Sequence, residues 1–174
     1  MNLIILPGNS PEHERWLNEA TNAFEPFFDE INAVHYRHWQ TGAPEVDESY
    51  EIEALRSLSM DMSDSVILAK SVGTVIASRA ISEDILRPRN TVFLGLPITN
   101  PLFSTSLEEY GLQNITPLTI VQNTNDPYGS FAVVQAFMAK IGATQATLVE
   151  TPGQTHDYED YEQYSSLLLE NGHY

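Results

Sequence analysis

The sequence predicts an α/β protein in which a mostly parallel sheet carries helices on both faces. Short apolar runs alternate with amphipathic segments from one end of the chain to the other, which is the pattern of strands joined by crossover helices. One apolar run stops at a serine and passes at once into a helical pattern, and polar loops with an aspartate and a histidine follow two later runs. Parallel strands bring such loops together at the carboxyl edge of a sheet.

The apolar runs predict six strands, at residues 3–6, 33–38, 65–69, 91–96, 118–122 and 146–150. Between them, apolar side chains recur at helical spacing in five segments, at residues 16–27, 52–62, 72–80, 131–141 and 161–168. The longest connection without an obvious helix is predicted at residues 97–116, between the fourth and fifth strands.

Length and composition limit the class of protein. A chain of 174 residues favours one domain over residues 1–174, with a substantial core. The 24 acidic residues outnumber the 8 lysines and arginines, which argues against binding to nucleic acid or to anionic membranes. The absence of cysteine excludes disulfides, a thiol nucleophile and thiolate metal sites. The apolar run at residues 3–6 is too short for a signal peptide or a membrane span, so we expect a cytoplasmic protein.

The segment Ala69-Lys70-Ser71-Val72-Gly73 has the layout of a nucleophile elbow. Small residues two positions before and after Ser71 allow a strand to turn sharply into a helix and push the serine outward on a strained backbone. Compared with the pattern G-x-S-x-G, the only departure is Ala69, which adds a single methyl group. The segment predicts that Ser71 is a nucleophile.

A serine nucleophile needs a base and a group that orients the base. Asp126 follows the fifth predicted strand in a turn-rich stretch, and His156 follows the sixth. Both therefore lie at the same sheet edge as Ser71. The three residues occur in the order Ser, Asp, His, which is the order in α/β hydrolases.

The chain resembles a small α/β hydrolase, of the lidless dienelactone-hydrolase-like branch or the group of retinoblastoma-binding protein nine. The resemblance is carried by the segments at residues 69–73, 92–97, 125–129 and 153–156, and it runs from Leu3 to Leu169. It implies the sheet order 2-1-3-4-5-6 and a serine hydrolase with the triad Ser71, Asp126 and His156, acting on a small acyl substrate such as an ester or thioester without a metal or organic cofactor.

Two backbone amides are expected to form the oxyanion hole. The amide of Val72 follows the nucleophile at a helix start, where the helix dipole favours negative charge. The second donor is expected in the loop after the first strand, where larger members of the family often carry His-Gly and this chain has Pro7-Gly8-Asn9. Asn9 is the favoured donor, and Gly8 and Ser10 are the alternatives.

The resemblance also places the substrate loop after the fourth strand. The predicted pocket walls are Leu96, Thr99, Leu102 and Phe103, with Trp39 at the end of the second strand. His35 and His38 fall on opposite faces of that predicted strand, so a metal site there is not expected. Two other functions remain open: a non-catalytic module that holds a protein partner through exposed aromatic residues such as Tyr158 and Tyr161, and a ligand-binding domain of flavodoxin or receiver type. The sequence does not indicate the oligomeric state.

Overall fold

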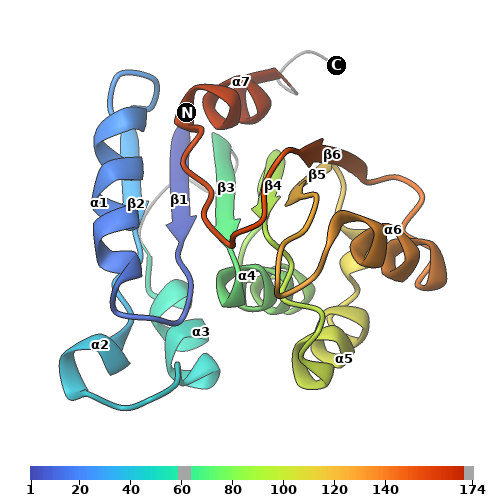
Figure 1. The fold of residues 1–174 in the computed structure, drawn as a ribbon. Helices are drawn as coiled ribbons and strands as arrows, with labels where there is room; N and C mark the ends of the chain where they lie inside the picture. The colour runs from blue at the N-terminus through green and yellow to red at the C-terminus, as the bar shows by residue number, and fades with distance from the viewer. Residues whose placement is uncertain (59–63, 171–174) are drawn as a thin grey trace.

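The computed structural model describes residues 1–58 and 64–170, and it contains a six-stranded sheet in the order β2-β1-β3-β4-β5-β6 (Figure 1). Every adjacent pair of strands is parallel. The strands are β1 (Asn2–Leu6), β2 (Glu30–Ala33), β3 (Ser65–Lys70), β4 (Asn90–Leu94), β5 (Leu118–Asn123) and β6 (Thr147–Thr151). The predicted fold class and strand order are confirmed.

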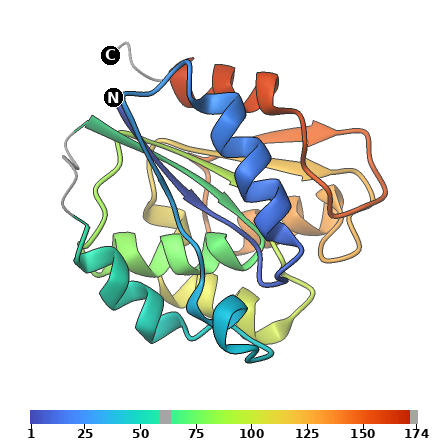
Figure 2. The same ribbon diagram turned by 90° about the vertical axis from the view of Figure 1, so that its left-hand side faces the viewer.

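Helices cover both faces of the sheet (Figure 2). On one face, α1 (His13–Phe24) and α7 (Tyr161–Glu170) pack on a core that contains Leu3, Val66 and Val92. On the other face, α3 (Glu48–Arg56), α4 (Val72–Ser82), α5 (Pro101–Glu109) and α6 (Phe131–Lys140) enclose a second core. The central strands β3 and β4 are buried along their whole length, because a parallel sheet with helices on both faces has no solvated side.

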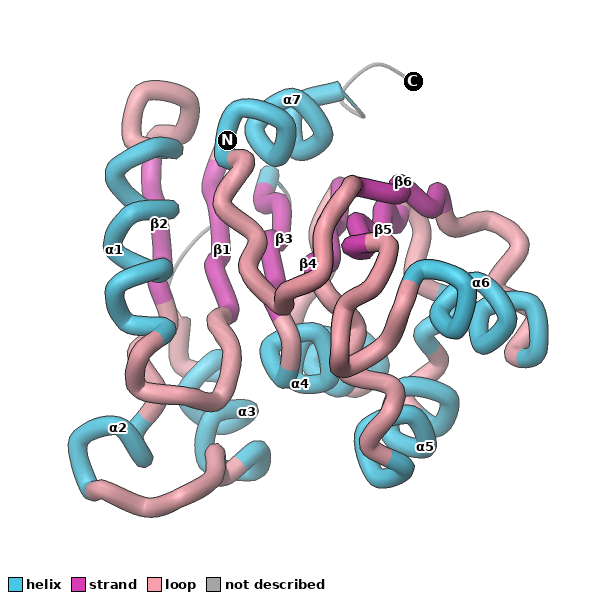
Figure 3. Tube along the Cα trace, viewed as in Figure 1, coloured by secondary structure: helices cyan, strands magenta, loops and turns pink. Residues whose placement is uncertain are grey.

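The loops that follow the strands gather at one edge of the sheet (Figure 3). Ser71 follows β3, Asp126 follows β5 and His156 follows β6. The parallel topology therefore brings together residues that are far apart in the sequence.

The second strand differs from its prediction at residues 33–38. The structure places β2 at Glu30–Ala33, paired with Asn2 to Ile5 of β1. β1 ends at Leu6, because the next residue, Pro7, has no N–H to donate. The pairing of β2 with β1 then ends at Ala33, and the chain that follows β2 leaves the sheet and forms the short helix α2 (Arg37–Thr41). The argument that strand alternation separates His35 from His38 is therefore wrong, because His38 lies in a helix.

The connection at residues 97–116 also differs, because it contains α5 and a 3₁₀ turn, Leu112–Asn114. The side chain of Asn100 caps α5 by accepting a hydrogen bond from the Leu102 amide, and Pro101 is the first helical residue. Asparagine followed by proline is a common helix start, so the sequence held a signal for this helix. The segment predicted at 52–62 forms α3, which ends at Arg56, and Met62 lies outside the described residues.

Candidate active site

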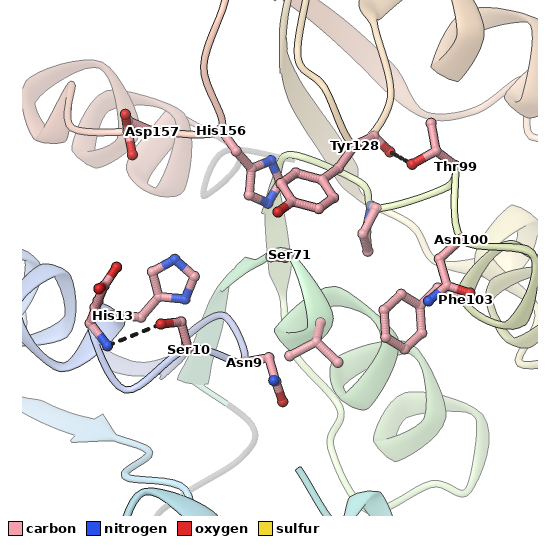
Figure 4. Close-up of a pocket in the computed structure, with 13 residues that line it drawn as sticks. Asn9, Ser10, His13, Ser71, Thr99, Asn100, Phe103, Tyr128, His156 and Asp157 are labelled. Atoms are coloured by element: carbon pink, nitrogen blue, oxygen red, sulfur yellow. Dashed lines mark hydrogen bonds between the residues drawn. The ribbon is translucent and has the colours of Figure 1, made fainter. Parts of the chain in front are cut away.

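Ser71 occupies a strained turn between β3 and α4. Its backbone has φ 55° and ψ −126°, a region that residues with a side chain rarely adopt. The Ser71 amide donates to the Leu94 carbonyl at 2.9 Å, which ties the turn to β4. The side chain lines a cavity of about 700 Å³ at the carboxyl edge of the sheet (Figure 4).

Gly73 lets the first turn of α4 approach β1 closely. A Cβ atom at this position would lie 2.3 Å from the Leu6 carbonyl oxygen and 2.7 Å from the Pro7 oxygen. No larger residue fits without moving the backbone. This approach places the start of α4, including the Val72 amide, beside the loop that follows β1. The first amides of a helix have no partner within the helix, so this end of α4 favours negative charge.

Asp126 and His156 form a hydrogen-bonded pair behind Ser71. Nδ1 of His156 lies 2.7 Å from Oδ2 of Asp126, and the two side chains are 11% and 0% exposed. Because a carboxylate only accepts hydrogen bonds, Nδ1 carries the proton. The other ring nitrogen, Nε2, is buried and has no hydrogen-bond partner among the described residues. In Figure 4 the His156 ring lies directly above Ser71, and both residues line the same cavity.

Tyr128 and Tyr158 surround this pair, and neither was among the predicted site residues. The Tyr128 amide donates to Oδ1 of Asp126 at 2.8 Å, and its ring centroid lies 4.6 Å from that of His156. The Tyr158 hydroxyl donates to Oδ2 of Asp126 at 2.6 Å. The nearness of these tyrosines to Asp126 and His156 in the sequence was the only available signal. The expectation that Tyr158 is an exposed aromatic is wrong, because it is 1% exposed.

The predicted pocket walls divide into two groups. Thr99 and Phe103 line the cavity with Ser71, and Thr99 donates to the Tyr128 carbonyl through both its amide and its hydroxyl. Leu96 and Leu102 are not among the lining residues. Leu96 is fully buried in the core, whereas Leu102 is 75% exposed on α5.

Trp39 supports the loop after β1 and does not line the cavity. It lies in α2, and its Nε1 donates to the Asn9 carbonyl at 2.9 Å. Nε2 of His38 lies 2.7 Å from the same oxygen. The Asn9 side chain donates to the Pro44 carbonyl and accepts from the Val46 amide. Asn9 therefore lines the cavity from a loop that is fixed by four hydrogen bonds.

His13 and Lys70 lie beside the cavity. Burial, followed by the charge of Lys70, lowers the pKa of His13 to about 4, so this histidine is neutral near pH 7. Lys70 points to the face of the sheet that α1 covers, with Nζ 5.3 Å from the centre of the Trp16 ring. Burial lowers its pKa to about 8. Lys70 lines a neighbouring cavity of about 480 Å³, which shares His13 with the Ser71 cavity.

Residues 1–58 and 64–170 contain no group of three or more histidine, aspartate or glutamate side chains arranged to hold a metal ion. They also contain no helix with the length and apolar character needed to cross a bilayer.

The fold has many counterparts among solved structures. TT1662 from Thermus thermophilus aligns with a TM-score of 0.67 and 17% identity, over 97% of this chain and 87% of its own. The Bacillus cereus carboxylesterase aligns with a TM-score of 0.60 and 15% identity, over 95% and 87%. The chain has the α/β-hydrolase fold. Acyl-protein thioesterase 2 from Zea mays shares it, with a TM-score of 0.63 and 12% identity over 98% and 93% of the two chains.

No protein-family model matches the sequence, and no curated protein matches it either. The identities to the solved structures are so low that they establish the α/β-hydrolase fold alone. Arguments about activity therefore depend on the residues of this chain.

Proposed function

We propose that this protein is a serine hydrolase that cleaves an ester or a related acyl bond of a small substrate. The observation that carries the proposal is the placement of three groups. Ser71, on a strained backbone, shares a cavity with His156. Nδ1 of His156 is hydrogen-bonded to Oδ2 of the buried Asp126 carboxylate, 2.7 Å away. The solved esterases and thioesterases with the same fold are consistent with this chemistry.

Each residue of the proposed triad has a defined role. The Ser71 hydroxyl oxygen attacks the acyl carbon while its proton moves to Nε2 of His156. Asp126 accepts from Nδ1, holding the ring orientation and stabilising the imidazolium that forms. His156 then gives the proton to the leaving group as the acyl bond breaks. In the second half-reaction, His156 takes a proton from a water molecule as it attacks the acyl-Ser71 ester. The bond between the acyl carbon and the Ser71 oxygen then breaks, the acid product leaves, and His156 returns the proton to Ser71.

The proposed oxyanion hole consists of the Val72 and Asn9 amides. Two amides aimed at the carbonyl oxygen would stabilise the charge that develops on it. Val72 and Asn9 both line the Ser71 cavity, and the hydrogen bonds of Asn9 to α2 and to residues 44–46 keep its loop in place. The Gly8 and Ser10 amides remain alternatives for the second donor.

The proposed substrate is a small soluble molecule. The protein is proposed to need no cofactor and to act in the cytoplasm. The Ser71 cavity has room for a compact acyl group, and apolar atoms of Val72, Pro97 and Phe103 are available to contact it. The protein-binding alternative has less support. Of the two tyrosines named for it, Tyr158 is buried and Tyr161 is only partly exposed.

A fluorophosphonate probe tests the proposal directly. The probe reacts covalently with an activated serine, and peptide mapping then identifies the modified residue. We expect labelling at Ser71 in the parent protein and none in the S71A variant. A folded parent protein that stays unlabelled, or one labelled at another serine, would contradict the proposal.

A further inference from the structure

Tyr158 lies outside the substrate cavity but inside the hydrogen-bond network of the site. Its hydroxyl donates to Oδ2 of Asp126 at 2.6 Å and accepts from the Asn123 amide at 3.1 Å. The same carboxylate oxygen accepts from Nδ1 of His156 at 2.7 Å. Tyr158 is 1% exposed, and it lines neither the Ser71 cavity nor the neighbouring one.

We propose that Tyr158 is a positioning residue, whose hydroxyl fixes the Asp126 carboxylate in the orientation that His156 requires. The inference rests on the proposed function, because positioning matters only if His156 acts as a base. It assigns to Tyr158 a role that the triad by itself does not include.

Three donors from two loops hold the Asp126 carboxylate. Oδ1 is fixed by the Tyr128 amide, two residues along the same loop, while Oδ2 is shared by Tyr158 and His156. A buried carboxylate with fewer donors would turn toward any remaining polar partner, because an unsatisfied buried charge is costly. Burial and the bond to Asp126 raise the pKa of Tyr158 above its usual range, so the hydroxyl stays protonated and donates.

Asn123 holds the loop that carries both His156 and Tyr158. Its side chain donates to the carbonyls of Thr155 and Asp157, at 2.9 and 3.1 Å, and these residues flank His156. A Cβ atom at Gly153 would lie 2.6 Å from Cγ of Asn123, so the loop packs directly against this side chain. Asn123, at the end of β5, thus fixes the position of His156 and Tyr158 relative to Asp126, which follows it in the chain.

The two aromatic rings are also held by packing. The rings of His156 and Tyr158 meet edge to face, with centroids 5.8 Å apart. A Cβ atom at Gly95 would lie 2.7 Å from Cε1 of His156 and 2.6 Å from Cε2 of Tyr158. Both rings therefore occupy the space that a side chain at position 95 would fill, and they pack against the Gly95 backbone.

Loss of the hydroxyl has a chemical consequence that a purely structural role would not have. A hydrogen bond from Tyr158 withdraws negative charge from Oδ2. Without it, the carboxylate is less well oriented and also holds the His156 imidazolium more strongly. We therefore expect slower turnover, and an acidic limb of the pH profile that moves to higher pH. Substrate affinity should not change, because Tyr158 does not touch the cavity.

The experiment compares Y158F with Y164F on a short-chain activated ester. Tyr164 is a second buried tyrosine, on α7, so Y164F removes a buried hydroxyl away from Asp126. We expect Y158F to lower kcat about tenfold or more, to leave KM within about twofold, and to move the acidic limb to higher pH. Y164F should change none of these. Unchanged kcat and an unchanged acidic limb in folded Y158F would overturn the inference.

A second measurement covers the case in which Y158F does not fold. Replacing Tyr158 by 3-fluorotyrosine keeps the hydroxyl and makes it a stronger donor, so the acidic limb should move to lower pH. No movement would overturn the inference. S71A separates the two proposals: turnover that persists in S71A refutes the proposed function, whereas turnover that is lost in S71A but unaffected at position 158 refutes only the role of Tyr158.

Discussion

On one side of the Ser71 cavity, the Asp126 side chain is buried, that of His156 is 11% exposed, and hydrogen bonds hold both. On the other side, Thr99 is exposed and Phe103 is only partly covered. The acid–base side is built from the ends of β5 and β6 and their loops. The substrate side comes from one loop and the first turn of α5. Groups that must keep a fixed geometry lie on the buried side, and groups that would select a substrate lie on the open side.

The largest expected effect tests whether the buried side performs catalysis. We expect S71A and S71G to lose ester hydrolysis by about 10⁴-fold or more, because both remove the nucleophile. The strain at φ 55°, roughly 1–3 kcal/mol for such a residue, is relieved by glycine and not by alanine. S71G should therefore unfold at the same temperature as S71A or higher. Turnover by either variant at the parent rate would refute the role of Ser71.

Gly95 provides a test of rigidity on the buried side. In G95A, the new methyl group would overlap His156 and Tyr158 and displace the base. Since a misplacement of about 1 Å can cost about 10²-fold in rate, we expect a loss of that order in kcat.

G42A is the matched control for G95A. Gly42 has φ 73°, close to the 63° of Gly95, but no atom lies within 4 Å of a Cβ placed there. Both variants carry the backbone cost of a left-handed alanine, and only G95A moves the histidine. Equal activities of the folded variants would show that the His156 position tolerates displacement.

Substitutions on the open side of the cavity should instead change the selectivity for the acyl group. We expect F103A to raise the kcat/KM of octanoyl relative to acetyl esters by roughly tenfold, because it enlarges the cavity. L102A is the control on the same helix, since Leu102 is exposed and does not line the cavity. If L102A changes the ratio as much as F103A, the substrate follows a path outside the described cavity.

The smallest expected effect concerns His13, at the border between the two sides. Its pKa of about 4 lies below the ordinary value of 6.5 because of burial, so the unfolded chain binds a proton at higher pH than the folded chain does. Above pH 6.5, His13 is neutral in both states and does not reduce the free energy of unfolding. As the pH falls from 6.5 toward 4, protonation of His13 in the unfolded chain lowers the free energy of unfolding. Between pH 6.5 and 4, the free energy of unfolding measured in urea should therefore fall less in H13Q than in the parent protein. An equal dependence on pH in the two proteins would contradict this prediction.

The sequence predicted the parts of the molecule that depend on local patterns. The strained turn at Ser71 was predicted because small residues at 69 and 73 are needed around a sharp turn, and the clash of any Cβ at Gly73 with Leu6 shows why. Five of the six strands lie within one or two residues of their predicted ends. The exception, β2, depends on where its partner β1 stops, which is a non-local property.

The positions of side chains around the site were harder to predict. Leu96 was expected in the pocket from its place after the fourth strand. The left-handed turn at Gly95, with φ 63°, and the bond from the Leu96 amide to Oε1 of Gln122 send it into the core instead. Tyr158 looked like a surface aromatic because acidic residues surround it in the sequence. Only the folded loop shows that its hydroxyl reaches Asp126.

β6 leads into the loop that carries His156, and it lies at the edge of the sheet with only partial burial. Its single neighbour is β5, so it can detach at a lower free-energy cost than the central strands. Such detachment would remove the base from Ser71 while most of the core stays intact. On heating, we expect hydrolysis to stop several degrees below the melting of the helices, and the working temperature of the protein is then set by one edge strand and not by its overall stability.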